Sequence, residues 1–215
     1  MKDDLCIVTG CNGSIGRSIA SSFKKKGFIV LGIDKSKSFS KDIDIPLHYD
    51  LKKIVNSEDY LLEFKKDLSV YLKKYNAKVL INNAAIQILS RSAMSDIKSL
   101  KDSFDTNAIA PFLIYRLVSK YLAKNDGCLV NIGSIHSSLT KDKFGLYASS
   151  KAALKSLTSS IAIENNGSPL TYLIEPAAIE TDMLKAGMKN KENLAKLASF
   201  HPVGSIGAPQ DIANI

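Results

Sequence analysis

Residues 8–16 read VTGCNGSIG, with glycines at positions 10, 13 and 16. An apolar run precedes them, and the run that follows, RSIASSFKKKG at 17–27, has the character of a helix. Glycine lets a chain turn sharply out of a strand and lets an anionic group approach the backbone. The N–H groups and positive end of the following helix then attract phosphate. The stretch therefore predicts a pyrophosphate-binding loop between a strand and a helix, with a tight surface turn as the alternative.

Six apolar runs of strand length extend this pattern along the chain. They lie at 5–10, 28–34, 45–50, 78–85, 128–134 and 170–176, and most are continuous rather than alternating. Such runs are typical of parallel strands that are covered on both faces. Amphipathic stretches lie between most of them, at 14–26, 57–75, 103–124 and 147–165. The alternation predicts an α/β fold, namely a Rossmann-like doubly wound parallel sheet flanked by helices, in a single domain covering residues 1–215.

The composition narrows the class of protein. Hydrophobic residues make up 45% of the 215 residues, which indicates a globular chain, and no run approaches the roughly 20 apolar residues of a membrane span. The beginning of the chain lacks the apolar core of a signal peptide, and the three cysteines are widely scattered. These features predict a cytoplasmic protein with no membrane partner and no disulfide framework.

The net charge of +8 raises the question of nucleic acid. Lysines carry most of it, spread along the expected helices, and the arginines are Arg17, Arg91 and Arg116. Phosphate and base recognition favours arginine, whereas scattered lysines are usually solvated. We therefore expect no nucleic-acid partner.

Asp34 ends the second expected strand, 18 residues after Gly16 (34 − 16). A carboxylate at that place can accept both ribose hydroxyls of an adenosine and would repel an additional phosphate on that ribose. Lys35, the next residue, could instead meet that phosphate, and a strand-end aspartate can also simply cap a turn. We expect NAD(H) as the preferred cofactor and NADP(H) as the less favoured one.

Ser134, Tyr147 and Lys151 carry the chemistry that such a cofactor needs. Tyr147 and Lys151 are four residues apart (151 − 147), so on a helix they share a face, and Ser134 ends a strand. Oxidation of an alcohol needs a base for the hydroxyl proton. A nearby ammonium group and a positive nicotinamide ring should lower the tyrosine pKa from about 10, and the serine can hold the substrate oxygen. The tyrosine–lysine pair alone is weak evidence, but the strand-end serine makes the pattern specific.

With these residues in order, the sequence resembles the short-chain dehydrogenase/reductase family over essentially the whole chain. The motifs that carry the resemblance are TGCNGSIG (9–16), YDL (49–51), NNAA (82–85), Asn107 in DTNAIAPF, Ser134 in VNIGS, YASSK (147–151) and PAAIET (176–181). The resemblance implies an NAD(H)-dependent oxidoreductase that interconverts an alcohol and a ketone or aldehyde.

The resemblance also implies roles for particular residues. It assigns a catalytic tetrad of Asn107, Ser134, Tyr147 and Lys151, in which Asn107 holds a water that relays protons to Lys151. The substrate would contact Ser134, Tyr147, His136 and Gln87, although His136 could also be an ordinary loop histidine. No spacing suggests a metal site. The expected cofactor contacts are Gly10, Asn12, Gly13, Ser14, Ile15, Gly16, Asp34, Lys35, Asp50, Leu51, Asn83, Ala84, Ala85, Tyr147, Lys151, Pro176, Ile179 and Thr181. Helices 103–124 and 147–165 would pair between subunits, which predicts a homodimer or homotetramer.

The sequence departs from the family pattern at several places. Ser14, Ala85 and Ala177 stand where glycine is common, residues 181–202 are expected to form a substrate lid, and the family's seventh strand would be missing at Ile215. The glycine spacing is closer to that of longer members acting on sugar nucleotides. Two alternatives are therefore an NAD-dependent dehydratase or epimerase of a nucleotide-linked sugar, and a non-catalytic cofactor-binding regulator.

Overall fold

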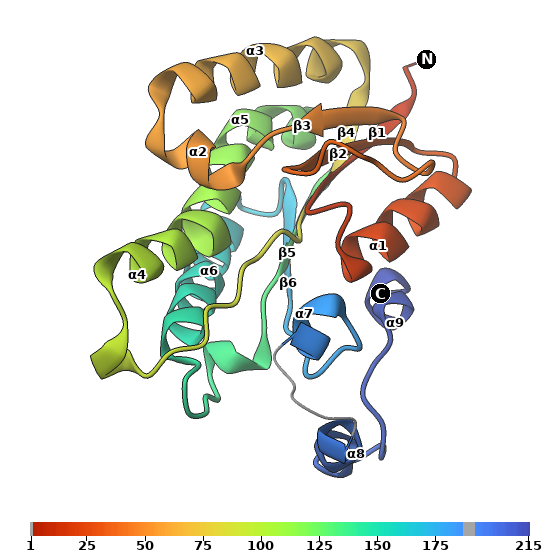
Figure 1. The fold of residues 1–215 in the computed structure, drawn as a ribbon. Helices are drawn as coiled ribbons and strands as arrows, with labels where there is room; N and C mark the ends of the chain where they lie inside the picture. The colour runs from red at the N-terminus through yellow and green to blue at the C-terminus, as the bar shows by residue number, and fades with distance from the viewer. Residues whose placement is uncertain (1, 187–191) are drawn as a thin grey trace.

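A computed structural model describes residues 2–186 and 192–215. Its strands form one parallel sheet in the order β3-β2-β1-β4-β5-β6 (Figure 1). The strands are β1 (Asp4–Thr9), β2 (Ile29–Asp34), β3 (Ile45–His48), β4 (Asn76–Asn82), β5 (Cys128–Ile132) and β6 (Leu170–Ile174). The predicted α/β fold is thus confirmed. The predicted strands run past most of these C-terminal ends, because the polar residues there leave the sheet for the loops above it.

The helices alternate with the strands. They are α1 (Ser14–Lys25), α2 (Leu51–Asn56), α3 (Glu58–Lys74), α4 (Ile97–Phe104), α5 (Ala110–Lys124), α6 (Gly145–Glu164), α7 (Asp182–Ala186), α8 (Glu192–Ser199) and α9 (Pro209–Ala213), with 3₁₀ turns at Ser92–Met94 and Ile135–Ser137. The predicted helix 103–124 is divided by a π-helical turn, Asp105–Ile109. None of the described helices is both long and apolar enough to cross a membrane.

Polar caps decide where several helices begin. The carboxylate of Asp50 accepts a hydrogen bond from the Lys52 amide and starts α2, which the sequence analysis did not predict. The Ser57 hydroxyl accepts from the Tyr60 amide and starts α3 directly afterwards. Such caps satisfy amides that have no partner within the helix. Asp50 is thereby fixed at the carboxyl edge of the sheet, next to β3.

Two apolar clusters cover the two faces of the sheet. Alternate residues of β1 point to opposite faces, so Leu5 and Ile7 join one cluster while Cys6 and Val8 join the other. The first cluster includes side chains of α3, α5 and α6, and the second includes side chains of α1 and α9. Helices on both faces explain why the strand sequences are continuously apolar.

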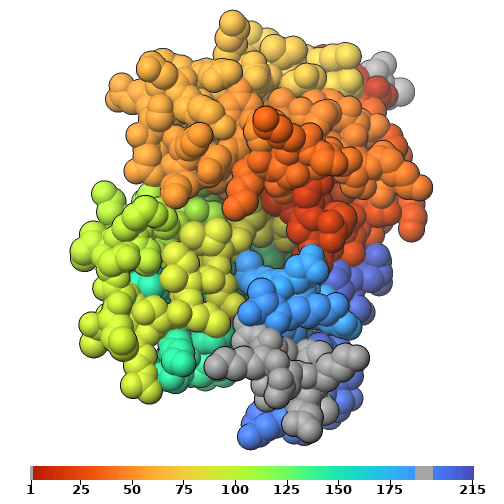
Figure 2. Space-filling view, viewed as in Figure 1, coloured from red at the N-terminus to blue at the C-terminus, as the bar shows by residue number. Residues whose placement is uncertain are grey.

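The order of the strands places a crevice above β1 and β4. β1 pairs with β2 on one side and with β4 on the other, so the chain runs outward from β1 to β3 and the connection after β3 returns to the opposite side of β1. A doubly wound sheet binds its ligand at such a switch point. Figure 2 shows the segment after β6, in blue, lying between the loop after β1, in red, and the yellow-green segment after β4.

Candidate active site

A cavity of about 950 Å³ opens at the carboxyl ends of the strands. Among the residues that line it are all of the predicted site residues except Gly16 and Asn107. Asp34, Lys35, Asp50 and Leu51 lie at the β2–β3 end, and Ser134, Tyr147 and Lys151 lie at the β5 end. Residues from six separate loops therefore meet in one cavity, which is large enough for a dinucleotide and a small molecule.

The glycine loop is shaped by contacts that tolerate no side chain at two positions. Gly10 has φ +62°, and a Cβ there would lie 2.7 Å from the Ala84 Cα. A Cβ on Gly16 would lie 2.1 Å from the Gly10 carbonyl oxygen. Gly16 therefore packs α1 against the loop rather than lining the cavity, which is a different role from the one that we expected for it.

Gly13 caps α1 without a side-chain hydrogen bond, and Ser14 and Ile15 in the first turn line the cavity. The amides of a first helical turn lack partners within the helix and attract anions. This cradle has the chemistry that a pyrophosphate requires, so the residues present fit a dinucleotide.

Asp34 is oriented by the backbone around it. Its two carboxylate oxygens accept hydrogen bonds from the amides of Asn12 (3.0 Å) and Ser36 (2.9 Å). The Asn12 side chain also donates to the Ser38 carbonyl, which holds the loop after β2 against the glycine loop. Each carboxylate oxygen keeps acceptor capacity, so Asp34 can still take the hydroxyls of a ribose.

Thr9 holds the loop after β4 in place, and the sequence analysis missed it. Its hydroxyl oxygen accepts from the amides of Asn83 and Ala84, both at 3.0 Å, and the Asn83 side chain donates to the carbonyls of Thr9 and Gly10. The position of Thr9, directly before the first glycine, was the available signal. These bonds fix the cavity floor between β1 and β4.

The alanines at positions 85 and 177 fit their loops. Positive φ angles at described non-glycine residues occur at Asp126, Lys143 and Asn166, so neither alanine adopts the conformation that requires glycine. Both alanines line the cavity. The departures from the family pattern at these positions therefore leave the backbone of the site intact.

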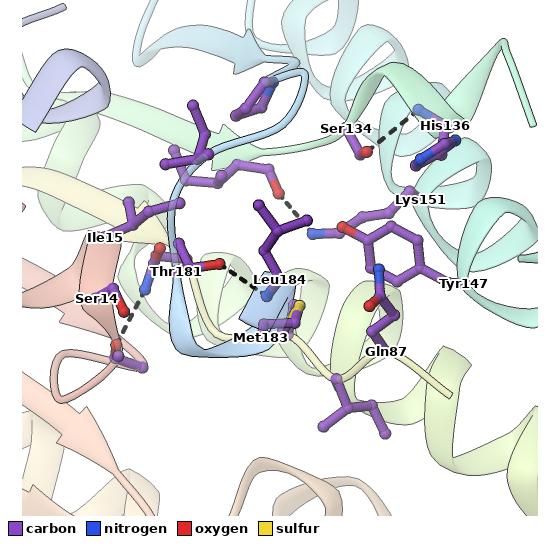
Figure 3. A pocket seen from close by; sticks show the side chains of 18 of the residues that line it. Ser14, Ile15, Gln87, Ser134, His136, Tyr147, Lys151, Thr181, Met183 and Leu184 are labelled. Carbon is purple, nitrogen blue, oxygen red and sulfur yellow. Dashed lines mark hydrogen bonds between the residues drawn. The ribbon is translucent and has the colours of Figure 1, made fainter. Parts of the chain in front are cut away.

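Ser134, Tyr147 and Lys151 lie together at the β5 end of the cavity (Figure 3). Ser134 follows β5 and caps the 3₁₀ turn, and its side-chain oxygen accepts from the His136 amide at 3.2 Å. Tyr147 and Lys151 are one turn apart on α6, and Lys151 Nζ donates to the Ile132 carbonyl at 2.6 Å. Lys151 Nζ lies 5.9 Å from the centre of the Tyr147 ring.

Burial controls the pKa of both α6 side chains. It raises the pKa of Tyr147, with a hydrogen bond to Ser134 acting in the opposite direction, and it lowers the pKa of Lys151 to about 8. Each group loses hydration that would stabilise its charged form. The lowered tyrosine pKa that we expected depends on the nicotinamide ring as well as on Lys151, so it stays a prediction for the protein with its cofactor bound. In the protein alone, desolvation raises the pKa of Tyr147.

Asn107 lies behind the cavity wall in the π-helical turn. It is fully buried, its Oδ1 accepts from the Ile86 amide at 2.8 Å, and its Nδ2 donates to the Ile86 carbonyl and to Ser150 Oγ, both at 2.9 Å. These bonds tie the loop after β4 to α6. Single π turns are frequent at functional sites, and this one turns Asn107 toward the α6 residues.

His136 and Phe144 form the wall beside Tyr147. The His136 ring lies 4.5 Å from the Phe144 ring and 6.3 Å from the Tyr147 ring, measured between centroids. His136 Nδ1 lies 2.9 Å from the Leu139 carbonyl oxygen, and burial lowers the histidine pKa. The sequence analysis missed Phe144, which precedes α6 without a motif of its own.

The segment after β6 is attached to the glycine loop. The Asp182 carboxylate accepts from Ser14 Oγ at 3.0 Å and lies 3.5 Å from Arg17, while the Asp182 amide donates back to Ser14 Oγ. Other residues of the predicted lid 181–202 line the cavity, and residues 187–191 lie outside the described part of the chain. The lining residues there are Thr181, Asp182, Met183, Leu184, Lys196, Leu197, Phe200, His201 and Pro202.

In the part of the chain that the structure describes, no group of three or more histidine, cysteine, aspartate or glutamate side chains is arranged to hold a metal ion. The described cysteines are unpaired thiols, and burial raises the pKa of Cys11 in the glycine loop to about 12. Cys11 is thus a packing residue of the second apolar cluster rather than a reactive thiol.

Known proteins resemble this chain over nearly its full length. It is 28% identical over 225 residues to an NAD-dependent glycerol dehydrogenase of Listeria innocua, covering 99% of this chain and 85% of that protein. It is 29% identical over 222 residues to a 3-oxoacyl-[acyl-carrier-protein] reductase of Escherichia coli, covering 98% and 86%. An aldohexose dehydrogenase of Thermoplasma acidophilum has a similar structure, with a TM-score of 0.87 at 25% identity, covering 99% and 85%.

A further solved structure, a 4-hydroxyisoleucine dehydrogenase complexed with NADH, has the same fold with a TM-score of 0.87 at 24% identity, covering 99% of this chain and 88% of that one. The family model described as short chain dehydrogenase matches residues 4–192. The chain therefore belongs to the short-chain dehydrogenase family, whose members are oxidoreductases that act on alcohols or carbonyls with NAD(P).

Proposed function

We propose that this protein is an NAD(H)-dependent dehydrogenase that interconverts an alcohol and a ketone or aldehyde. The observation that carries the proposal is the meeting of Ser134, Tyr147 and Lys151 at one end of a cavity whose other end holds Asp34. The residues along that cavity would hold a hydride donor or acceptor, and Tyr147 and Ser134 would hold the substrate oxygen beside it. One cavity thus combines a hydroxyl that can hold the substrate oxygen, a phenol that can exchange its proton and an ammonium group beside that phenol.

Tyr147 is the proposed acid–base group. Its phenolate oxygen takes the proton of the substrate alcohol in oxidation, and its hydroxyl gives a proton to the carbonyl oxygen in reduction, while Ser134 Oγ holds the same substrate oxygen. A nicotinamide held in this cavity would supply or accept the hydride, and its positively charged oxidised ring would favour the tyrosinate. Lys151 adds to that field, because its ammonium group lies beside the Tyr147 ring and its nearest partner, the Ile132 carbonyl, is uncharged.

Asn107 is proposed to hold the water that connects Lys151 with the proton path. Its Oδ1 accepts one protein hydrogen bond and keeps capacity for another, and its bonds to Ile86 and Ser150 fix its position. A rigid amide behind a buried lysine is suited to order a water there. The role of Asn107 is therefore one of positioning, and the proton is exchanged at Lys151 Nζ.

The preference for NAD(H) rests on Asp34. A carboxylate aimed by two backbone amides offers acceptors to ribose hydroxyls and repels a ribose phosphate. The Listeria innocua relative is named as NAD-dependent, which agrees with this assignment. Lys35 is exposed beside it and is the group that would favour NADP(H).

We also propose that the chain acts as a homodimer or homotetramer. Apolar side chains around α4 are exposed, among them Met94 (78%), Ile97 (71%) and Ile109 (38%). Met94 and Ile97 lie before the first of the expected pairing helices and Ile109 lies within it, so a second copy that pairs there would cover them. Light scattering at micromolar concentration tests this, and a monomeric mass would refute it.

The test of the proposed function has two parts. Titration of the protein with NADH and with NADPH, followed by nucleotide fluorescence, should give tighter binding of NADH. Oxidation of a panel of alcohols should then fall by about 10²–10⁴-fold in Tyr147→Phe while NADH binding is retained. Binding of neither nucleotide would reject the proposal. A smaller loss of turnover in Tyr147→Phe would reject the role of the tyrosine, and tight binding by the wild type without any turnover would favour a cofactor-binding regulator.

A further inference from the structure

His136 is held in one tautomer by the turn that follows β5. Its Nδ1 lies 2.9 Å from the Leu139 carbonyl oxygen, which can only accept a hydrogen bond, so Nδ1 carries the ring proton. The ring is partly buried against Phe144, and both this burial and the charge of Lys141 disfavour a second proton. The ring is therefore a neutral imidazole whose Nε2 has a lone pair.

That lone pair has no partner among the described residues. Nδ1 is used by Leu139, the His136 amide is used by Ser134, and the ring lines the cavity beside Tyr147. The other histidine of the cavity differs in this respect, because His201 Nδ1 lies 2.9 Å from the Leu197 carbonyl and its Nε2 accepts from the Ala178 amide at 3.4 Å. His136 thus provides a hydrogen-bond acceptor next to the reacting position.

We propose that His136 Nε2 accepts a hydrogen bond from a second hydroxyl group of the substrate, close to the carbon that is oxidised. This inference rests on the proposed function and names its substrate class, which is a vicinal diol or a larger polyol of the sugar type. Ser134 links the two positions, since its Oγ holds the reacting oxygen in the proposed function and accepts the amide of His136. The donor that a polyol presents matches the acceptor that the protein leaves open.

The rest of this end of the cavity agrees with a polyol. Figure 3 shows the Gln87 side chain on the opposite side of the Tyr147 ring from His136, with Met183 and Leu184 to the left of that ring. Gln87 offers an amide with both donors and an acceptor, which suits further hydroxyls.

The magnitude follows from the cost of one unmade hydrogen bond. A site built around a hydroxyl discriminates against the analogue that lacks it, because its hydrogen-bond acceptor is then left without a partner. We expect kcat/KM for a vicinal diol to exceed that for its monool by roughly tenfold. The discrimination should appear in substrate pairs that differ by that hydroxyl alone.

The experiment measures the diol-to-monool ratio of kcat/KM, with NAD, for 1,2-propanediol against 2-propanol and for cis-1,2-cyclohexanediol against cyclohexanol. His136→Phe keeps an aromatic ring and removes the acceptor, so the ratio should fall about tenfold, whereas His136→Gln should restore part of it. His201→Phe is the matched control, since both His201 nitrogens are already engaged, and it should change both rates by the same factor.

NADH binding, measured on the same samples, distinguishes a failure of the proposed function from a failure of the assignment of His136. Absence of NADH binding to the wild type would overturn the proposed function itself. Intact NADH binding with turnover of the monools, but with equal or lower rates for the diols or an unchanged ratio in His136→Phe, would overturn the assignment of His136 alone.

Discussion

Replacement of Asp34 by asparagine should change which nucleotide the protein prefers. Asp34→Asn keeps an oxygen that can accept from the amide of Asn12 or Ser36, so the glycine loop remains anchored. The substitution removes the negative charge and one ribose acceptor. It therefore separates the electrostatic contribution of Asp34 from its structural one, which Asp34→Ala would remove as well.

Asp34→Asn should weaken the binding of NADH and strengthen the binding of NADPH. Hydrogen bonds to a charged group contribute about 1.5–3 kcal/mol and neutral ones about 1 kcal/mol, so NADH should lose roughly tenfold in affinity. One unit charge facing another at about 4–5 Å in a half-exposed site is worth on the order of 1–2 kcal/mol, so NADPH should gain about tenfold. The ratio of the two dissociation constants should thus shift by about a hundredfold.

The assay is a titration of wild type and variant with NADH and NADPH, followed by nucleotide fluorescence. Asp44→Asn serves as the control, because Asp44 pairs with Lys24 and accepts from the Val30 amide outside the cavity. It changes the net charge equally and should leave the ratio unaltered. Equal affinities of the wild type for both nucleotides, or an unchanged ratio in Asp34→Asn, would show that Asp34 does not select the cofactor.

Three further changes test other parts of the site. Tyr147→Phe should lower kcat by about 10²–10⁴-fold with NADH affinity unchanged, and a smaller loss would remove Tyr147 as the acid–base group. Gly16→Ala should abolish nucleotide binding or folding, since its Cβ would lie 2.1 Å from the Gly10 carbonyl oxygen, whereas Gly13→Ala (3.3 Å) should be milder; equal effects on melting temperature would contradict this reasoning. Because burial lowers the pKa of Lys151 from 10.5 to about 8, the folded state binds fewer protons than the unfolded state between those pH values. Between pH 7 and 9.5 the free energy of unfolding of the wild type, measured with urea, should therefore rise by on the order of 1–2 kcal/mol relative to that of Lys151→Met. A fall of this difference with rising pH would contradict the lowered pKa of Lys151.

The sheet could be predicted from the sequence because few folds other than a parallel sheet covered by helices bury continuous apolar strands on both faces. Leu5 to Val8 must be covered on both faces, and helices between successive runs do this with parallel strands. The convergence of the site followed from the same topology. Asp34, Asn83 and Ser134 all follow strands whose carboxyl ends lie at one edge, so their meeting required no knowledge of side-chain contacts.

Contacts between distant segments could not be predicted in the same way. Ser14 and Asp182 are 168 residues apart, and nothing in either segment indicates that the hydroxyl of one meets the carboxylate of the other. The π-helical turn at Asp105–Ile109 has no recognisable sequence pattern either. It accompanies the hydrogen bonds that Asn107 makes to the Ile86 amide and to Ser150 Oγ. Such features depend on how finished elements pack, and not on local pattern.

The shifted pKa values of Tyr147 and Lys151 could not be predicted from the sequence either, although they matter for catalysis. The sequence placed Lys151 beside Tyr147 but did not indicate that both would be desolvated. An acidic partner for Lys151 would hold its charge at less cost to folding. It would also cancel the field of that charge at the tyrosine, because opposite charges in contact act as a dipole whose effect falls off quickly. The uncharged Ile132 carbonyl orients the ammonium group without neutralising it. The site therefore holds a cation without a neutralising partner. This lowers the free energy of unfolding, but it leaves the field of the Lys151 ammonium group free to act on Tyr147.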